Sequence, residues 1–265
     1  MLLNSTLKTA VLPLDIADGD KKANFAAVER LMSRIDADTD LVILPELFST
    51  GFINDRDKMF ELSEPNSGET VAEIKRLAQS YNVAVSGSYL ARTASSMYNR
   101  GFFIEPSGEE TFYDKHHLFK ISAEATMLNA GVTMPPVVRF RGWNITMIVC
   151  YDLRFPVWCR NTDRRYDLMI VPANWPQARA YAWEHLLIAR AIENQAYVIG
   201  ANRSGRDAFG DYDKLTFAYD YLGRPIAATD DQNKIVYAVP DKDKLNKFRE
   251  DFPVWNDADD FGLRL

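Results

Sequence analysis

The chain has 265 residues, 47% of them hydrophobic and 26% charged, which is enough apolar material for a large folded core. Its formal net charge is −6, with acidic and basic residues interspersed, so the sequence offers no basic face to a nucleic acid or an anionic membrane. Its apolar runs are too short to span a membrane and residues 1–5 lack the features of a secretion signal, so we expect a cytoplasmic protein that acts on a small molecule, with no nucleic-acid or membrane partner.

Hydrophobic patterns predict strands alternating with helices along the first half of the chain. Continuous apolar runs predict buried strands, and apolar residues at spacings of three and four predict helices with one buried face. The predicted elements are, in order, a strand over 6–16, a helix with apolar residues at Phe25, Val28, Leu31, Met32 and Ile35, a strand over 41–45, a loop through Gly51 and Pro65, a helix with Val71, Ile74, Leu77, Ala78 and Tyr81 on one side, and strands over 83–89, 100–105 and 111–113.

The second half continues this alternation and ends in a charged tail. The predicted elements are a strand over 143–150, a helix through Trp158 and Arg160, a strand over 167–171, a helix over 183–195, a strand over 196–201, and two final strands, one ending near 216–218 and one covering 234–239. No internal repeat or linker divides the sequence. We therefore expect one α/β domain over residues 1–265, with a tail from about 241 to 265 that wraps a partner subunit.

Cys150 ends the apolar run 143–150 and is followed at once by the polar turn 151–156. The thiol is therefore expected to be exposed at the C-terminal end of a strand, the edge at which open α/β sheets bind ligands. A helix start after it would offer backbone N–H groups to a thiolate or an oxyanion. The alternative is that Cys150 merely packs, as free cysteines often do. We expect Cys159 to pack in this way and no disulfide to join the two.

Two other polar side chains stand near the ends of predicted strands. Glu46 directly follows the all-apolar run 41–45, and Lys115 lies in the polar stretch 113–119 between aromatic residues. Each by itself is consistent with an ordinary solvated residue. With Cys150 they supply a base, a cation and a nucleophile, which is the set that amide hydrolysis requires.

Three motifs resemble those of the carbon–nitrogen hydrolase (nitrilase) superfamily, in the same order along the chain. They are Pro45-Glu46, Asp114-Lys115-His116-His117-Leu118-Phe119 and Cys150-Tyr151-Asp152-Leu153-Arg154-Phe155-Pro156. The amidase branch, and bacterial ω-amidases within it, is favoured by Ala173-Asn174-Trp175-Pro176, by the stretch 189–195, by Phe252-Pro253 and by the stretch 257–261. The resemblance extends from about Lys8 to the C-terminus.

The resemblance implies a fold, an assembly and an activity. The fold is an α-β-β-α sandwich of two sheets with helices on the outer faces, and the assembly is a homodimer formed through helical faces. The activity is hydrolysis of the terminal amide of a 2-oxo dicarboxylic acid monoamide, such as 2-oxoglutaramate or 2-oxosuccinamate, through an acyl-thioester and without a cofactor. Two alternatives stay open: an N-carbamoyl amide or deaminated glutathione amidase, and a non-catalytic binding protein of the same fold.

The catalytic roles follow from the motifs and from the chemistry of amides. Cys150 is the expected nucleophile and Glu46 the general base, while Lys115 favours the thiolate and holds the oxyanion together with the N–H of Tyr151. Glu124 falls where the family has an additional glutamate, so we expect it to orient Lys115 or the substrate amide. The alternative for Glu124 is an exposed helix residue.

A substrate with a carboxylate at its far end needs a cation and apolar walls. Arg154 is the candidate cation nearest in sequence to Cys150, and Phe48, Phe119 and Trp175 are the candidate walls. An alternative role for Arg154 is to brace the loop behind Cys150 through Asp152 or a glutamate.

Histidines and metals offer rival chemistry. His116 or His117 could activate Cys150 as in a Cys–His protease, and Glu46 would then be dispensable. His185 is expected to pack or to cap a helix. The two cysteines and three histidines show no zinc-binding spacing, so we expect no metal.

Overall fold

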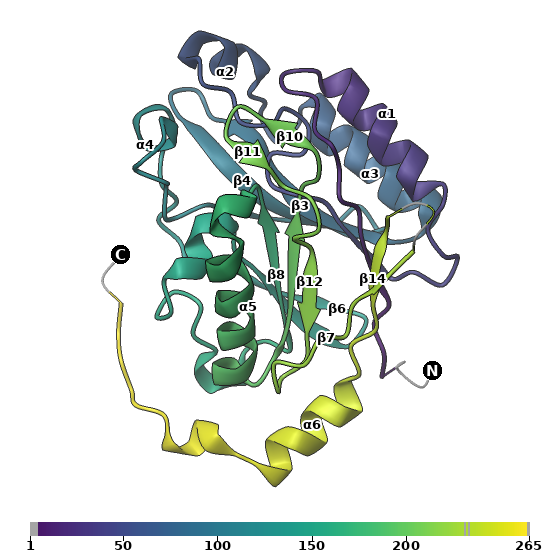
Figure 1. The fold of residues 1–265 in the computed structure, drawn as a ribbon, viewed down its shortest axis with the longest axis vertical. Helices are drawn as coiled ribbons and strands as arrows, with labels where there is room; N and C mark the ends of the chain where they lie inside the picture. The colour runs from purple at the N-terminus through teal and green to yellow at the C-terminus, as the bar shows by residue number, and fades with distance from the viewer. Residues whose placement is uncertain (1–4, 231, 233, 264–265) are drawn as a thin grey trace.

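The computed structural model describes residues 5–230, 232 and 234–263, and it contains two large β-sheets packed face to face with helices outside them (Figure 1). The first sheet contains, in spatial order, β13 (Ala228–Thr229), β14 (Val236–Ala238), β1 (Thr9–Val11), β2 (Leu41–Ile43), β3 (Ala84–Arg92), β4 (Met97–Ile104) and β5 (Glu110–Asp114). The second contains β12 (Phe217–Tyr219), β9 (Tyr197–Asn202), β8 (Leu168–Ala173), β7 (Trp143–Met147) and β6 (Val137–Phe140). This arrangement confirms the predicted α-β-β-α sandwich. Residues 1–4, part of the stretch expected to lack a secretion signal, lie outside the described residues.

Helices cover the outer faces of both sheets. The helices are α1 (Lys21–Met32), α2 (Arg56–Leu62), α3 (Glu69–Tyr81), α4 (Glu124–Met127), α5 (Ala180–Asn194) and α6 (Lys242–Asp251), with short 3₁₀ turns at Cys150–Arg154, Thr162–Arg164, Gln177–Arg179 and Val254–Asp257. Helices α1 and α3 lie side by side over the first sheet, and α5 lies over the second (Figure 1). No helix in the described part of the chain is both long and apolar enough to cross a membrane.

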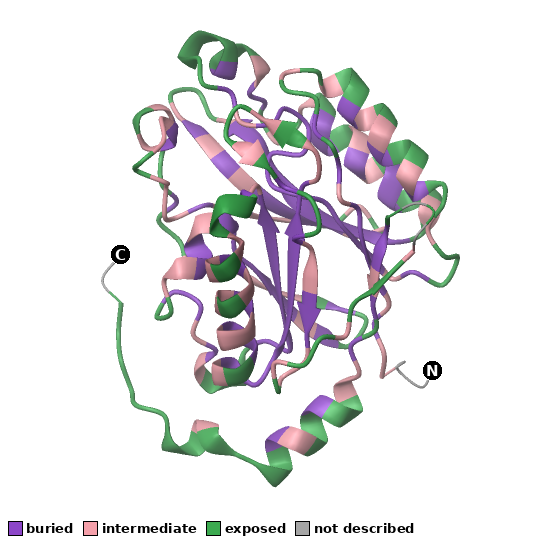
Figure 2. Cartoon of the chain, viewed as in Figure 1, coloured by how far each residue is buried: buried purple, intermediate pink, exposed green. Residues whose placement is uncertain are grey.

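Side-chain alternation builds the layers on either side of the first sheet. Leu41 and Ile43 on β2 point toward the second sheet, whereas Val42 between them packs with the residues of α1 and α3. Because both faces are covered, β2 is continuously apolar rather than alternating, as the sequence pattern indicated. The strands are accordingly the most buried part of the molecule (Figure 2).

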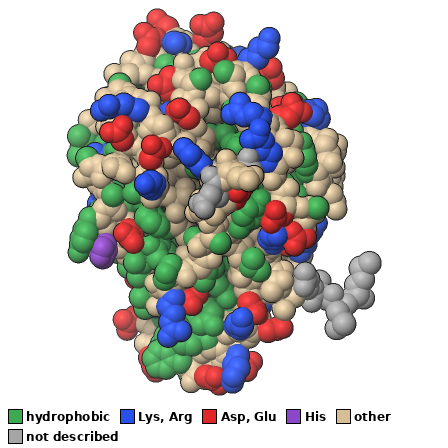
Figure 3. Space-filling model, turned by 45° about the vertical axis from the view of Figure 1, so that its right-hand side comes forward, with side chains coloured by type: hydrophobic (Ala, Val, Ile, Leu, Met, Phe, Trp, Pro, Cys, Tyr) green, Lys and Arg blue, Asp and Glu red, His purple; other side chains and the backbone are tan. Residues whose placement is uncertain are grey.

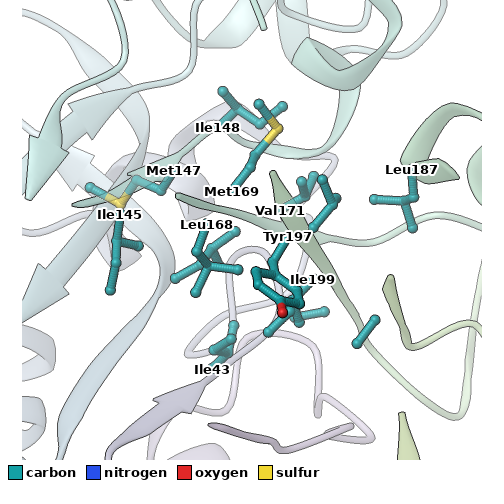
Figure 4. Close-up of a cluster of buried hydrophobic side chains, with 14 of the residues drawn as sticks. Ile43, Ile145, Met147, Ile148, Leu168, Met169, Val171, Leu187, Tyr197 and Ile199 are labelled. Atoms are coloured by element: carbon teal, nitrogen blue, oxygen red, sulfur yellow. The ribbon is translucent and has the colours of Figure 1, made fainter. Parts of the chain in front are cut away.

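The core between the sheets joins residues that are far apart in the sequence. Ile43 from the first sheet lies in one cluster with Ile145, Leu168 and Ile199 of the second (Figure 4). On the outer side, α5 approaches β9 so closely that a Cβ on Gly200 would lie 2.5 Å from the Leu187 side chain. This close packing fixes α5 against the second sheet.

Three local predictions differ from the structure. The helix predicted after Cys150 is a short 3₁₀ turn, Cys150–Arg154, because Pro156 cannot supply the N–H that a continuing helix needs. The predicted loop 51–65 contains α2, whose start is capped by Asp55 accepting from the N–H of Lys58 at 2.8 Å. The strand predicted over 6–16 is regular only at Thr9–Val11.

The described part of the tail begins with a helix that packs on the chain's own body. Residues 242–251 form α6, which packs on the chain's own body through the fully buried Leu245 and through Arg249. The Arg249 guanidinium donates to Asp167 at 2.9 Å, and Lys242 donates to the other oxygen of that carboxylate at 2.8 Å. Residues 252–263, after α6, are mostly exposed (Figure 2), and the contact of the tail with a partner subunit stays a prediction.

We expect Asp167→Ala to destabilise the protein by about 3–5 kcal/mol, because it leaves the buried Arg249 guanidinium without its carboxylate. Lys247→Ala is the matched control on the same helix, since it removes only the exposed pair with Asp251 and should cost less than about 1 kcal/mol. Urea unfolding of both variants measures the difference. Equal losses would show that the Asp167 pair does not hold α6 in place.

Candidate active site

Four of the predicted catalytic side chains line one cavity of about 270 Å³. Glu46 follows β2, Lys115 follows β5, Glu124 begins α4, and Cys150 follows β7. The Lys115 Nζ lies 2.9 Å from the Glu46 Oε1 and 2.8 and 3.0 Å from the two Glu124 oxygens. The structure thus brings together residues separated by up to 104 positions, 46 to 150.

The backbone places Glu46 and Lys115 through the strands that precede them. The N–H of Lys115 donates to the Asn99 carbonyl at 2.9 Å, which extends the β4–β5 ladder by one step. After Glu46 the chain turns sharply, since Leu47 has a positive φ of 48° and its N–H donates to the Ser88 Oγ at 2.9 Å. Both side chains therefore start from well-fixed backbone.

Cys150 is held in a strained turn by the neighbouring carboxylate of Asp152. Cys150 has a positive φ of 45°, a conformation that costs on the order of 1–3 kcal/mol for a residue other than glycine. The fully buried Asp152 accepts from the N–H of Val149 at 3.2 Å, from Tyr113 at 2.8 Å, and from the backbone and ring of His117 at 2.9 and 2.8 Å. This carboxylate ties the turn that carries the thiol to the segment that carries Lys115.

The same contacts bear on the rival Cys–His scheme. The Nδ1 of His117 faces Asp152, and its ring stacks on Phe155 with centroids 3.6 Å apart. His116 stacks on Trp158 at 3.9 Å. Neither histidine is among the described residues that line the cavity, so the geometry favours Glu46 over a histidine as the base for Cys150.

The thiol is less exposed than the sequence led us to expect, and this changes its charge at rest. Cys150 is only 9% exposed. Burial first, and then the Glu46 carboxylate, raises the pKa of Cys150 well above its usual value, and Lys115 lowers it by less. Burial also opposes the charge on Lys115, but Glu124 and then Glu46 raise the pKa of Lys115 well above its usual range. Lys115 therefore favours the thiolate, as expected, but burial and Glu46 together outweigh it and favour a neutral thiol beside the ammonium.

Glu124 is buried and not an exposed helix residue. Its two oxygens accept from Lys115, and one of them also accepts from the N–H of Phe119 at 2.7 Å. Two carboxylates therefore share one ammonium. The ammonium has three N–H bonds, and three carboxylate oxygens, one on Glu46 and two on Glu124, lie within hydrogen-bonding distance of it.

Most of the predicted substrate-binding residues line the cavity, but Phe48 does not. Tyr151, Arg154, Phe119 and Trp175 are all lining residues. Phe48 is fully buried on the helix side of the first sheet, 6.2 Å from the Phe25 ring, because its N–H bonds to the Ser88 carbonyl beside β3. The expectation that Phe48 forms a pocket wall is therefore wrong.

The cavity contains two guanidinium groups, of which sequence reasoning found only one. Arg154 lies over the Trp175 ring at 4.7 Å, and Arg179 lies over the Phe119 ring at 5.2 Å. The available signal for Arg179 was its position just after the Asn174-Trp175-Pro176 motif. Among the described residues, neither guanidinium forms an ion pair with a carboxylate. Asp152, the partner expected if Arg154 braces the loop behind Cys150, instead accepts from Tyr113 and His117.

A short hairpin, β10 (Arg206–Asp207) and β11 (Gly210–Asp211), adds lining residues that local sequence could not indicate. It carries Asp207 and Phe209 to the cavity. Asp207 is already paired with Arg203 at 3.1 Å and accepts from Tyr212 at 2.9 Å. No group of acidic, cysteine and histidine side chains suited to a metal ion occurs among the described residues.

Comparison with known proteins identifies the family. A model described as carbon-nitrogen hydrolase matches residues 8–250. The chain is 39% identical to Omega-amidase YafV of Escherichia coli (strain K12), covering 97% of this chain and 98% of that protein. It is 31% identical to 2-oxoglutaramate amidase of Bacillus subtilis (strain 168), covering 93% of this chain and 95% of that protein. This chain therefore belongs to the carbon–nitrogen hydrolase family.

A solved structure supports the same assignment. XC1258 from Xanthomonas campestris is a CN-hydrolase superfamily protein whose crystal structure has an arsenic adduct in the active site. It is 36% identical to this chain with a TM-score of 0.90, covering 98% of this chain and 99% of that one. The fold and the order of its elements are thus those of the family.

Glu46→Gln should make Cys150 react with iodoacetamide at lower pH, because removing the carboxylate removes a charge that raises the thiol pKa. The adduct can be followed by intact mass across a pH series, with Cys159→Ser included to assign the modified thiol. Hydrolytic activity should be lost in the same variant. An alkylation profile that stays in place or moves to higher pH would contradict this account of the thiol.

Proposed function

We propose that the chain is a cysteine-dependent amidase that hydrolyses the terminal amide of 2-oxo dicarboxylic acid monoamides, such as 2-oxoglutaramate and 2-oxosuccinamate, to the acid and ammonia. The observation that carries this proposal is the single cavity in which Cys150, Lys115 and Glu46 meet, with two guanidinium groups on its wall. The named activities of the relatives support the choice of substrate. An open cavity that reaches the thiol argues against the non-catalytic alternative.

The first half-reaction forms an acyl-thioester. The Cys150 sulfur attacks the amide carbonyl carbon while its proton passes to Glu46, so the neutral thiol becomes nucleophilic only as the bond forms. When the tetrahedral intermediate collapses, the carbon–nitrogen bond breaks and Glu46 returns the proton to the departing nitrogen. Ammonia leaves, and the acyl group stays on the sulfur.

The second half-reaction reverses the roles of the leaving group and the nucleophile. Water attacks the thioester carbon and gives a proton to Glu46. The carbon–sulfur bond then breaks, and the sulfur recovers that proton as the acid departs. The same carboxylate therefore serves both half-reactions.

Lys115 stabilises the negative oxygen in both tetrahedral intermediates. Its three N–H groups bond to one Glu46 oxygen and both Glu124 oxygens, and the substrate oxygen, on binding, replaces one of the two bonds to Glu124. The backbone N–H of Tyr151 is the proposed second donor. Because Lys115 is buried and its charge is maintained by the two glutamates, its donors need no reorganisation during the reaction.

The far end of the substrate is a 2-oxo acid, and the cavity has the charge to receive it. Arg154 and Arg179 lie along the aromatic cluster of Phe119, Tyr151 and Trp175, as cations without a carboxylate partner among the described residues. The acidic lining residues Glu46, Glu124 and Asp207 are each already paired with a cation. A carboxylate is therefore favoured there, and the α-ammonium of glutamine finds no free acid.

Ammonia release from 2-oxoglutaramate, 2-oxosuccinamate, glutamine and a carbamoyl amino acid should be fastest with the first two. Arg154→Gln and Arg179→Gln should each raise KM for 2-oxoglutaramate by about 10-fold or more, as expected for a lost charge-assisted hydrogen bond, with a smaller effect on kcat. Arg206→Gln is the control, because that exposed arginine pairs with Asp211 and does not line the cavity. A preference for the carbamoyl compound would favour the alternative amidase activity.

We also propose a cytoplasmic homodimer in which the outer face of α5 and the tail after α6 meet a second copy. Tyr181 and Ile192 on α5 are 77% and 49% exposed, and Phe252 in the tail is 57% exposed, so apolar surface is available for an interface. Acidic and basic side chains are interspersed over the face drawn in Figure 3, which suits a soluble partner and not a lipid surface. Sedimentation at micromolar concentration should give the dimer mass. A monomer alone would contradict it.

A further inference from the structure

Asn99 donates from its side-chain amide to both carboxylates of the site and accepts from the backbone N–H of Lys115. It lies on β4 with its side chain fully buried. Its amide nitrogen donates to the Glu46 Oε1 at 2.7 Å and lies 3.4 Å from the Glu124 Oε1, while its backbone carbonyl accepts from the backbone N–H of Lys115 at 2.9 Å. Asn99 does not line the cavity, so any role it has is exerted through these neighbours.

The site has an electrostatic problem that a neutral donor can solve. Glu46 and Glu124 both approach the Lys115 ammonium, so two negative charges share one positive charge in a buried space. Adjacent buried carboxylates tend to retain one proton between them, and a proton held on Glu46 would remove the base. A second cation would cancel the excess charge, but it would also compete for the oxygens. An amide NH₂ stabilises both carboxylates and leaves the charge unchanged.

The orientation of the amide is consistent with this function. The Asn99 Oδ1 is buried without a hydrogen-bond partner among the described residues. Leaving such an acceptor unsatisfied costs about 1–3 kcal/mol. The reverse orientation would direct that oxygen at two carboxylates, so the charges fix the NH₂ end toward them. The fold therefore tolerates an unfavourable group at this position in order to present the donor.

The bonds also distinguish the two oxygens of Glu46. The Oε1 accepts from Lys115 and Asn99, whereas the Oε2 accepts from the N–H of Asn174 at 2.9 Å. Asn174 lines the cavity together with Cys150. The less occupied oxygen is thus the one on the side of the reacting groups.

We propose that Asn99 is a positioning residue that stabilises the adjacent carboxylates of Glu46 and Glu124 by donating to both and directs the Glu46 Oε2 toward the Cys150 thiol. The inference rests on the proposed role of Glu46 as the general base. It concerns the same site and adds a residue that does not touch the substrate. The titratable groups facing the carboxylate pair are Lys115 and Cys150.

Two substitutions of similar size should give opposite pH trends. Asn99→Leu removes the donor and favours the protonated pair, so kcat for 2-oxoglutaramate should fall about 100-fold at pH 7 and recover relative to wild type as the pH rises. Asn99→Asp replaces the amide donor with a third carboxyl group, which can donate a hydrogen bond only when it is protonated. The kcat of this variant relative to wild type should therefore increase as the pH falls. KM should change by less than about 3-fold in both variants.

Asn24→Leu is the matched control, because Asn24 is also a buried asparagine but its NH₂ donates only to the Ala17 and Ser49 carbonyls. It should lose stability in urea without changing the shape of the pH profile. Asn24→Leu should lower kcat by the same factor at every pH, if it lowers kcat at all. If Asn99→Leu and Asn99→Asp also lower kcat by a factor that does not change with pH, the role of Asn99 is structural and the proposal is wrong.

A measurement without substrate separates this inference from the proposed function. The infrared difference spectrum of Asn99→Leu against wild type at neutral pH should show a protonated carboxyl band that Glu46→Gln or Glu124→Gln removes. If wild type hydrolyses none of the amides but this band appears, the proposed function fails and the role of Asn99 stands. If wild type is active and no band appears, the role of Asn99 is refuted.

Discussion

The site depends on one interaction, the buried ammonium of Lys115 between the carboxylates of Glu46 and Glu124. Each of these charges would be costly to bury by itself, and each is tolerated because the ammonium lies within hydrogen-bonding distance of both carboxylates. Since the three residues come from different elements, the ion cluster also fixes the ends of β2 and β5 and the start of α4 relative to one another. The same ion pairs therefore both compensate the buried charges and position the three side chains.

This arrangement affects the protonation state of Cys150. A thiolate in the cavity would be a third negative charge opposite one positive charge, and burial would weaken its solvation as well. Both effects favour the protonated thiol at rest. The strained turn at Cys150, held by Asp152, keeps the sulfur at the cavity without requiring it to be charged.

The wall of the cavity, in contrast to the ion cluster around Lys115, carries positive charge from two arginines. Arg154 and Arg179 contact aromatic faces, and the acids near them are occupied by other cations. Because these guanidinium groups have no carboxylate partner among the described residues, we propose that the cavity receives a substrate with an anionic end remote from the scissile amide. In this proposal the ion cluster around Lys115 serves amide hydrolysis in general, and the arginines of the wall restrict the amide to one with a distant carboxylate.

The sequence by itself determined the layered fold and the family, and it predicted four polar residues, Glu46, Lys115, Glu124 and Cys150, that the structure places at one cavity. Apolar runs such as 41–45 and 167–171 are local signals, and the motifs around Glu46, Lys115 and Cys150 lie at the ends of those runs, where a strand must surface. What the tertiary structure decided depends on contacts between distant segments. Packing, and not local pattern, buries Phe48 on the helix side of the first sheet. It also places Arg179 and the β10–β11 hairpin at the cavity, and Asn99 between the two glutamates. The protonation of Cys150 belongs to the same group, because the energy of a charge depends on its burial and on neighbours that no short stretch of sequence contains.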